Sequence, residues 1–218
     1  MENQSVFQKL MGFINKAGTA IMMNLLFLAA CLPVVTIGAA WSGIYGAVRF
    51  TIRGDSWFEG FKEGYKCHFW RNLIGWTFGT LVGGYACYNL YGHVGYLLAG
   101  NPASAGVIVP LVVSGIVALA ALLVVAIMLP LGMYFPQLDA NTWLVTTWDV
   151  ILHAPLQSLG VVVLMWLPLG MFIFAEQYFV MFAIVFVAVY YILAALVATV
   201  LLKNPLLRIL KRYPREEE

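Results

Sequence analysis

The feature that most constrains this chain is the absence of Lys and Arg between Arg71 and Lys203, although the sequence contains twelve such residues. The formal charges within that stretch are Asp139, Asp149 and Glu176. Water-facing surface is built largely from charged side chains, so this stretch cannot form the surface of a soluble domain of its size. We therefore expect it to be surrounded by lipid.

The composition of the whole chain agrees with a membrane environment. Hydrophobic residues make up 62% of the 218 residues, charged residues 10%, and the mean hydropathy is +0.88. Soluble domains contain about 25% charged residues. The length predicts one integral membrane domain over residues 1–218. The net charge of +2 gives no indication of a nucleic-acid partner, so the expected partner is the lipid bilayer.

The ends of the apolar segments predict an all-α, polytopic transmembrane bundle. A straight span needs about 20 residues, and the charge-free run over 17–48 is too long for one. Pro33 interrupts it, and Thr36 has the chemistry of a helix cap. We therefore predict a helical hairpin broken over Pro33, Thr36 and Gly38, although one kinked span over 17–48 would reduce the total from six spans to five. The six predicted spans are 17–34, 37–53, 72–91, 106–130, 156–174 and 178–202.

Two further segments are predicted to be amphipathic helices at the membrane surface. Residues 54–71 begin with a capping-box pattern, Ser56 to Glu59, and then alternate an aromatic face with a charged face. Residues 136–155 carry tryptophans, which are common at that depth. Basic residues near these surfaces are candidates for contact with lipid headgroups; they are Arg49, Arg53, Lys62 and Lys66.

Small residues at four-residue spacing predict close helix packing. One stripe consists of Gly75, Gly79 and Gly83, and the other of Ala39, Gly43 and Ala47. The helix that packs there belongs either to this bundle or to a partner membrane protein.

A short motif occurs twice, around Pro130 and around Pro168, as Leu-Pro-Leu-Gly-Met. Prolines in corresponding spans can break helices and form a transporter site. Both prolines are therefore candidate helix breaks, with chance similarity in so apolar a sequence as the alternative.

The distribution of basic residues predicts the orientation, because cytoplasmic loops are enriched in Lys and Arg. Six spans with both termini in the cytoplasm place all twelve basic residues on that side. We therefore predict a multi-pass protein of the cell membrane with cytoplasmic N- and C-termini. The loop over 92–105 would then face outward.

No motif points to catalysis, a cofactor or a metal. The histidines lack metal-ligand spacing, and the adjacent Cys67 and His68 would point apart on a helix. The cysteine count is odd and favours reduced residues. Asn24 within the first span and Glu176 at a turn are candidate ligand or partner contacts. Their alternatives are a hydrogen bond to a neighbouring helix for Asn24 and a polar turn for Glu176.

The first third of the chain resembles a known family. The motif consists of Asn24-Leu25-Leu26, the run from Leu32 to Ala40, Ile44-Tyr45 and the basic amphipathic stretch ending in Asn72. It is similar to the YesL-like family, the domain of unknown function numbered 624, whose members are small bacterial integral membrane proteins. The segment Tyr134 to Leu138 is similar to a second, weaker family feature, but the 136–155 segment lacks the basic residues expected there.

The resemblance implies no established activity and no catalytic residue. It implies an accessory, non-enzymatic role beside carbohydrate transporter subunits, because members are associated with carbohydrate uptake. A small transporter or channel is the alternative, motivated by the prolines.

Overall fold

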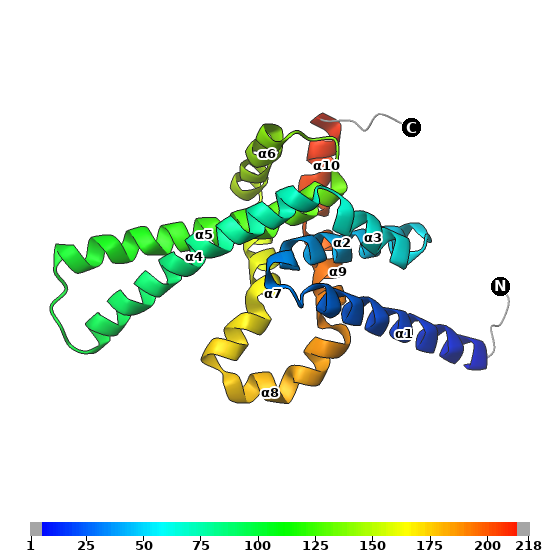
Figure 1. Ribbon diagram of the computed structural model, residues 1–218, viewed down its shortest axis with the longest axis horizontal. Helices are drawn as coiled ribbons and strands as arrows, with labels where there is room; N and C mark the ends of the chain where they lie inside the picture. Colours follow the sequence, from blue (N-terminus) through cyan, green and yellow to red (C-terminus); the bar gives the residue numbers. More distant parts are fainter. Residues whose placement is uncertain (1–5, 213–218) are drawn as a thin grey trace.

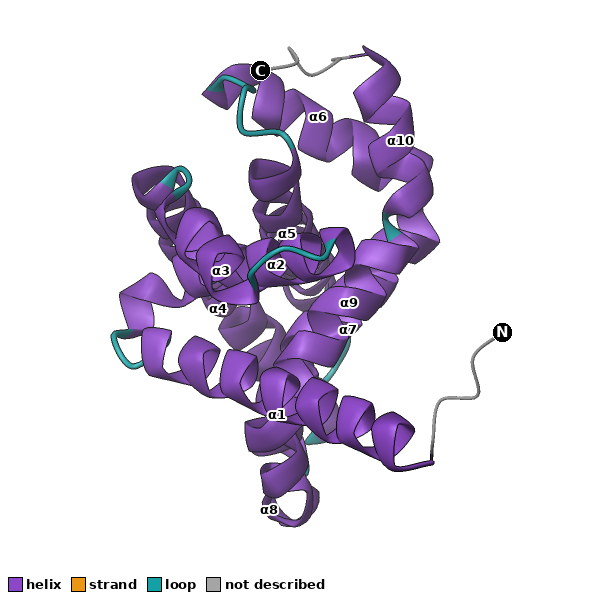
Figure 2. Cartoon of the chain, turned by 90° about the vertical axis from the view of Figure 1, so that its right-hand side faces the viewer, coloured by secondary structure: helices purple, strands orange, loops and turns teal. Residues whose placement is uncertain are grey.

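The computed structural model describes residues 6–212, and within that range all side chains except those of residues 6–14, 173, 174, 176, 179 and 212. These residues form helices, turns and short loops, and no strand occurs among them (Figure 2). The predicted all-α class is therefore confirmed.

The elements, in chain order, are α1 (Val6–Ala30), a 3-10 turn (Val34–Thr36), α2 (Ile37–Arg53), α3 (Trp57–Lys66), α4 (Phe69–Leu98), α5 (Ala105–Tyr134), α6 (Ala140–His153), α7 (Pro155–Phe174), α8 (Glu176–Val185), the π-helix η2 (Phe186–Tyr190), α9 (Tyr191–Leu201) and α10 (Lys203–Arg212).

Helix α2 forms the centre of the fold. Every residue from Gly38 to Val48 is buried, and α1, α3, α4, α5 and α9 all contact this helix (Figure 1). Its many small residues allow neighbours to approach on several sides. At its start, a Cβ atom on Gly38 would lie 2.6 Å from the carbonyl oxygen of Asn72, so α2 touches the backbone of α4 there.

Helix α3 packs against α2 through glycines on both helices. A Cβ atom on Gly46 would overlap the carbonyl oxygen of Gly60, and one on Gly60 would lie 2.6 Å from the carbonyl oxygen of Gly46. The aromatic face of α3 is directed inward, with Phe61 buried, while its charged face is exposed. The predicted amphipathic helix therefore exists, but its apolar side covers α2.

The hydrogen bond predicted for a capping box at Ser56 is absent. Helix α3 begins directly after Ser56, yet the Ser56 side chain makes no capping hydrogen bond. The contact with α2 holds the helix start in place instead. Helix α6 does carry a side-chain cap, because the carboxylate of Asp139 accepts hydrogen bonds from the amides of Asn141 and Thr142 at 3.2 and 3.4 Å. The hydroxyl and amide of Thr142 lower the pKa of that carboxyl.

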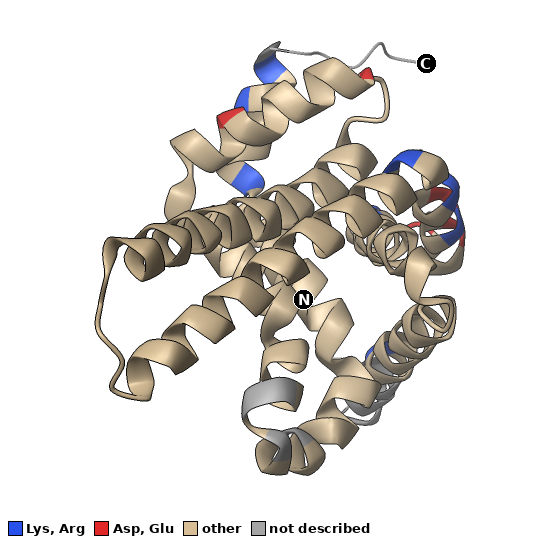
Figure 3. Ribbon diagram, turned by 60° about the vertical axis from the view of Figure 1, so that its left-hand side comes forward, with Lys and Arg blue, Asp and Glu red and all other residues tan. Residues whose placement is uncertain are grey.

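Helices α4 and α5 form a long antiparallel hairpin that projects from the centre (Figure 1). Their connection covers only residues 99–104, because α4 continues to Leu98. It is therefore shorter than the predicted loop over 92–105. Figure 3 shows that this hairpin lacks charges beyond its base, whereas charged residues gather on α3 and around α6 and α10.

The predicted interruption at Pro33 is present, but Thr36 acts differently from the prediction. Helix α1 ends at Ala30 and α2 begins at Ile37. The hydroxyl of Thr36 lies 2.6 Å from the carbonyl oxygen of Ala30 and 2.7 Å from that of Pro33, and it makes no capping bond to α2. It therefore satisfies the end of α1 and closes the turn.

Pro130 and Pro168 do not end their helices. Helix α5 continues past Pro130 to Tyr134, and α7 continues past Pro168 to Phe174. Proline is tolerated within apolar helices where neighbouring groups satisfy the freed backbone. The predicted breaks at these two positions are corrected accordingly.

Three described helices are long and apolar enough to cross a membrane. They cover Ala105–Tyr134, Pro155–Phe172 and Val180–Leu201, which correspond to the last three predicted spans. The count of six is not confirmed. The predicted span over 37–53 is α2, whose 17 residues are largely enclosed by other helices.

Candidate functional site: a polar junction at the end of α5

The last turn of α5 and the loop that follows it are bound by side chains from α2, from the connection between α3 and α4, and from the start of α4. Helix α5 ends before Pro136, which has no amide hydrogen to give to the carbonyl of Gly132. Four side chains donate hydrogen bonds to the backbone carbonyls of this region instead. The hydrogen bonds run from Arg49 Nη1 to Met133 O (3.1 Å), from Cys67 Sγ to Gly132 O (3.8 Å), from His68 Nε2 to Pro136 O (2.7 Å) and from Arg71 Nη1 to Leu138 O (3.0 Å). Two arginines near a helix C-terminus also complement its dipole.

His68 reaches this junction from a strained backbone. Its φ of 51° is left-handed, and no other non-glycine residue in the described part of the chain has a positive φ. Burial lowers the pKa of the imidazole, against the opposing effect of the bond to Pro136, while burial raises the pKa of the Cys67 thiol. The two side chains bind different carbonyls, so neither acts as a base for the other.

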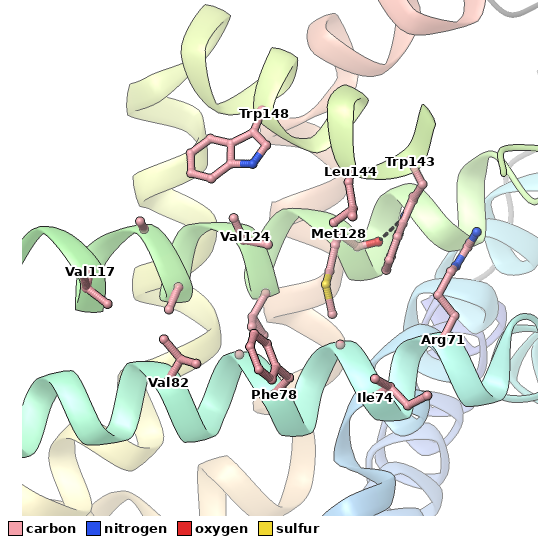
Figure 4. A pocket seen from close by; sticks show the side chains of 15 residues that line it. Arg71, Ile74, Phe78, Val82, Val117, Val124, Met128, Trp143, Leu144 and Trp148 are labelled. Carbon is pink, nitrogen blue, oxygen red and sulfur yellow. Dashed lines mark hydrogen bonds between the residues drawn. The ribbon is translucent and has the colours of Figure 1, made fainter. Parts of the chain in front are cut away.

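Arg71 ties α4 to α6. Its guanidinium lies over the ring of Trp143, 4.2 Å from the ring centroid, a cation–π contact (Figure 4). The indole Nε1 of Trp143 in turn donates to the carbonyl of Met128 at 3.1 Å. Burial lowers the pKa of Arg71, and Cys67 and Asp139 oppose that shift. The stack therefore fixes α6 over the end of α5.

Asn72 and Gly132 complete the inner wall of the junction. The amide of Asn72 donates to the carbonyl of Cys67 at 3.0 Å and so closes the turn between α3 and α4. A Cβ atom on Gly132 would lie 3.3 Å from Arg71 Nη2 and 3.4 Å from Asn72 Oδ1. Any side chain at position 132 would therefore press on both polar groups.

An apolar groove of about 600 Å³ extends from this junction between α4, α5 and α6 (Figure 4). Phe78 and Val124 line its length, and Trp148 lies over it. Arg71 is the ionisable residue of its lining. The groove can accept an apolar chain, and its lining supplies no nucleophile with a neighbouring base.

Asn24 lies outside this junction, and both polar atoms of its side chain are hydrogen-bonded within the fold. Its Nδ2 donates to the carbonyls of Phe186 and Val187 at 2.9 and 2.6 Å, and its Oδ1 accepts from the amides of Tyr191 and Ile192 at 2.9 and 3.3 Å. The π-helix interrupts the normal backbone pairing, and Asn24 satisfies the released groups. The side chain is fully buried. The structure thus places it as a contact between helices, and its amide has no capacity left for a ligand.

The glycine stripe packs within this chain. A Cβ atom on Gly75 would overlap Met128, one on Gly79 would overlap Val125, and one on Gly83 would lie 3.3 Å from Ala121, all on α5. The stripe on α2 is also enclosed: Ala39 and Ala47 are fully buried, and Gly43 faces the ring of Phe61. Neither stripe is open to a partner.

The remaining candidates are dispersed. Arg49 belongs to the junction, while Arg53 and Lys66 are exposed and Lys62 pairs with Glu59 at 3.4 Å. The side chain of Glu176 lies outside the described residues. All three cysteines are free. The described residues contain no cluster of three or more His, Cys, Asp or Glu that could hold a metal ion.

The sequence predicted neither the stack of Arg71 on Trp143 nor the hydrogen bonds to the carbonyls of residues 132–138. The available signal was the second family feature, Tyr134 to Leu138. This segment contains two of the four bound carbonyls, those of Pro136 and Leu138, and directly follows the other two, so the two features form one junction.

Replacing Arg71 by methionine is expected to loosen α6. The change keeps the length of the side chain but removes the bond to Leu138 and the charge over Trp143. We expect the free energy of unfolding to fall by about 2–3 kcal/mol. Amide hydrogen exchange of residues 136–153 in detergent should rise. Lys62→Met, which removes an exposed cation, is the control, and equal exchange in both variants would contradict the role given to Arg71.

The comparisons with known proteins bear on the same segment. The family model described as "Protein of unknown function, DUF624" matches residues 20–90. No curated protein and no solved structure matches the chain. The matched residues include α2, α3, Asn24 and the donors of the junction. The resemblance seen in the sequence is thus confirmed. Residues 20–90 of this helical chain match the family of unknown function DUF624.

Proposed function

We propose that this chain is a non-enzymatic, multi-pass protein of the cell membrane that binds another membrane protein along the exposed face of α4, with both termini in the cytoplasm. The observation that carries the proposal is a stripe of large apolar side chains on α4 that the fold leaves uncovered. Its members are 62–75% exposed and recur every three or four residues; they are Trp70, Ile74, Phe78, Leu81, Tyr85 and Tyr88. That spacing is typical of a seam between two helices.

The tyrosines of the stripe favour a protein partner over lipid tails alone. Tyr85 and Tyr88 lie near the middle of α4, far from either end. The span predicted over 72–91 places both hydroxyls in hydrocarbon, where each needs a hydrogen-bond partner because leaving it without one costs free energy. A second helix on this face would supply backbone or side-chain acceptors. The seam continues at Gly92 and Gly95, where a Cβ atom would meet open space.

The class of partner follows from the family resemblance. Proteins of this family are associated with carbohydrate uptake. We therefore propose a subunit of a carbohydrate importer as the partner. The stripe on α4 supports an interaction with a membrane protein, and the family supports the choice of that protein.

A small transporter receives less support from the structure. The two prolines that suggested broken helices lie inside continuous helices, and the amide of Asn24 is fully occupied. The interaction proposal depends on neither feature.

The test is site-specific photo-crosslinking in cells. A photoreactive amino acid at Leu81, in the stripe, should give one discrete adduct with an importer subunit. The same probe at Val163, which is 59% exposed on α7, is the control. Combining the Leu81 probe with Tyr85→Ala should reduce the adduct severalfold. Equal adducts at both positions, or none at Leu81, would refute the proposal.

A further inference from the structure

A second apolar surface, formed by α1, α2 and α9 with the start of α10, carries positive charges. We propose that one anionic phospholipid binds there, with an acyl chain between α1, α2 and α9 and its phosphate between Lys16 and Lys203. This inference is independent of the proposed partner of α4.

The acyl-chain part is a groove of about 410 Å³ lined by α1, α2 and α9. Met23 and Val48 form its buried wall, and Leu196 is part of its α9 side. The polar residues of its lining are Asn15, Lys16, Thr19 and Thr51. The volume lies within the range of about 300–1,000 Å³ typical of small-molecule sites. Apolar walls with a polar, cationic end suit an amphiphile better than a soluble ion.

A second hollow of about 410 Å³ lies on the other side of Ile52, which lines both. It is formed by the ends of α2 and α5 together with α9 and α10. Lys203 and Leu207 belong to its lining. Lys16 and Lys203, far apart in the sequence, therefore line neighbouring hollows that share Ile52. Figure 2 shows the elements concerned, with α10 continuing from α9 and α1 crossing the lower part of the bundle.

Charge complementarity selects the headgroup. Among the residues that the structure describes, no acidic side chain lines either hollow, whereas each hollow contains a lysine. Arg53 follows directly after Ile52 and is exposed. Lys203 also lies two residues beyond Leu201, the end of a helix able to cross a membrane, which is the depth of lipid phosphates. A negatively charged headgroup is therefore favoured over a zwitterionic one.

Native mass spectrometry of the full chain in detergent tests this. Phosphatidylglycerol and phosphatidylcholine of equal acyl length are titrated separately. We expect phosphatidylglycerol to bind more tightly, and Lys16→Gln combined with Lys203→Gln to weaken its binding roughly 30-fold without affecting phosphatidylcholine. Lys62→Gln, on the exposed face of α3, is the matched control and should have no effect. Leu196→Trp, which fills the groove, should weaken binding of both lipids.

The outcomes separate the alternatives. Equal affinity for the two lipids, or unchanged phosphatidylglycerol binding in the double lysine variant, would overturn the proposal. Displacement of phosphatidylglycerol by millimolar inorganic phosphate would also overturn it, because the site would then recognise a soluble anion. Thermal melting of each variant by circular dichroism verifies that the exposed lysine substitutions leave the fold intact.

Discussion

Replacing Gly46 by valine is expected to separate α2 from α3 and to destabilise the fold strongly. A Cβ atom at this position overlaps the carbonyl oxygen of Gly60, which belongs to the backbone of α3 and cannot rotate away. The helices would have to move apart, so the buried ring of Phe61 would lose its place against Gly43. We expect the free energy of unfolding to fall by about 3 kcal/mol or more.

The measurement is thermal unfolding in detergent, followed by size-exclusion chromatography. Gly18→Val on α1 is the matched control, because a Cβ atom at Gly18 meets nothing within 4 Å. Both changes replace a helical glycine by valine, so the change in helix propensity is the same. A Gly46→Val protein that melts within a few degrees of Gly18→Val would show that α3 is not held by this contact.

Replacing Asn24 by leucine should destabilise the π-helix between α8 and α9. The change leaves two backbone carbonyls and two backbone amides of the π-helix region without their side-chain partner. Hydrogen bonds between membrane helices contribute about 0.6 kcal/mol each on average, and buried polar groups without a partner cost more. We therefore expect a loss of about 2–4 kcal/mol.

Hydrogen exchange should locate the effect at residues 186–192 and in the adjoining part of α1. Asn89→Leu, a half-buried position on α4, is the control and should change neither stability nor exchange at the π-helix. If the Asn24 variant retains wild-type exchange there, the π-helix does not depend on this side chain.

The local signals of the sequence located both ends of α2, the helix at the centre of the fold. Pro33 and the start of α2 at Ile37 were predicted because proline cannot donate a helical hydrogen bond. The end of α2 at Arg53 follows from Gly54, which adopts a φ of 87° that other residues rarely reach. These features depend on neighbours in the chain, and a sequence pattern contains that information.

The sequence did not show in the same way which helix packs against each helix face. The stripe of Gly75, Gly79 and Gly83 predicts a close neighbour but is equally suited to α5 and to another protein. Likewise, the sequence showed that Arg71 begins the apolar segment, and it could not show that this cation would lie on Trp143. Such contacts depend on how distant helices cross, which no local pattern encodes.

By itself, the sequence determined the helical class, the apolar segments long enough to cross a membrane and the break at Pro33, because each follows from the solvation or the backbone chemistry of adjacent residues. The tertiary structure alone decided that α3 covers α2, that the amide of Asn24 serves a π-helix, and that the segment from Arg49 to Arg71 holds the end of α5. It also placed Lys16 and Lys203 in the linings of two neighbouring hollows that share Ile52. The physical reason is that close packing selects one arrangement among many that the same apolar pattern permits.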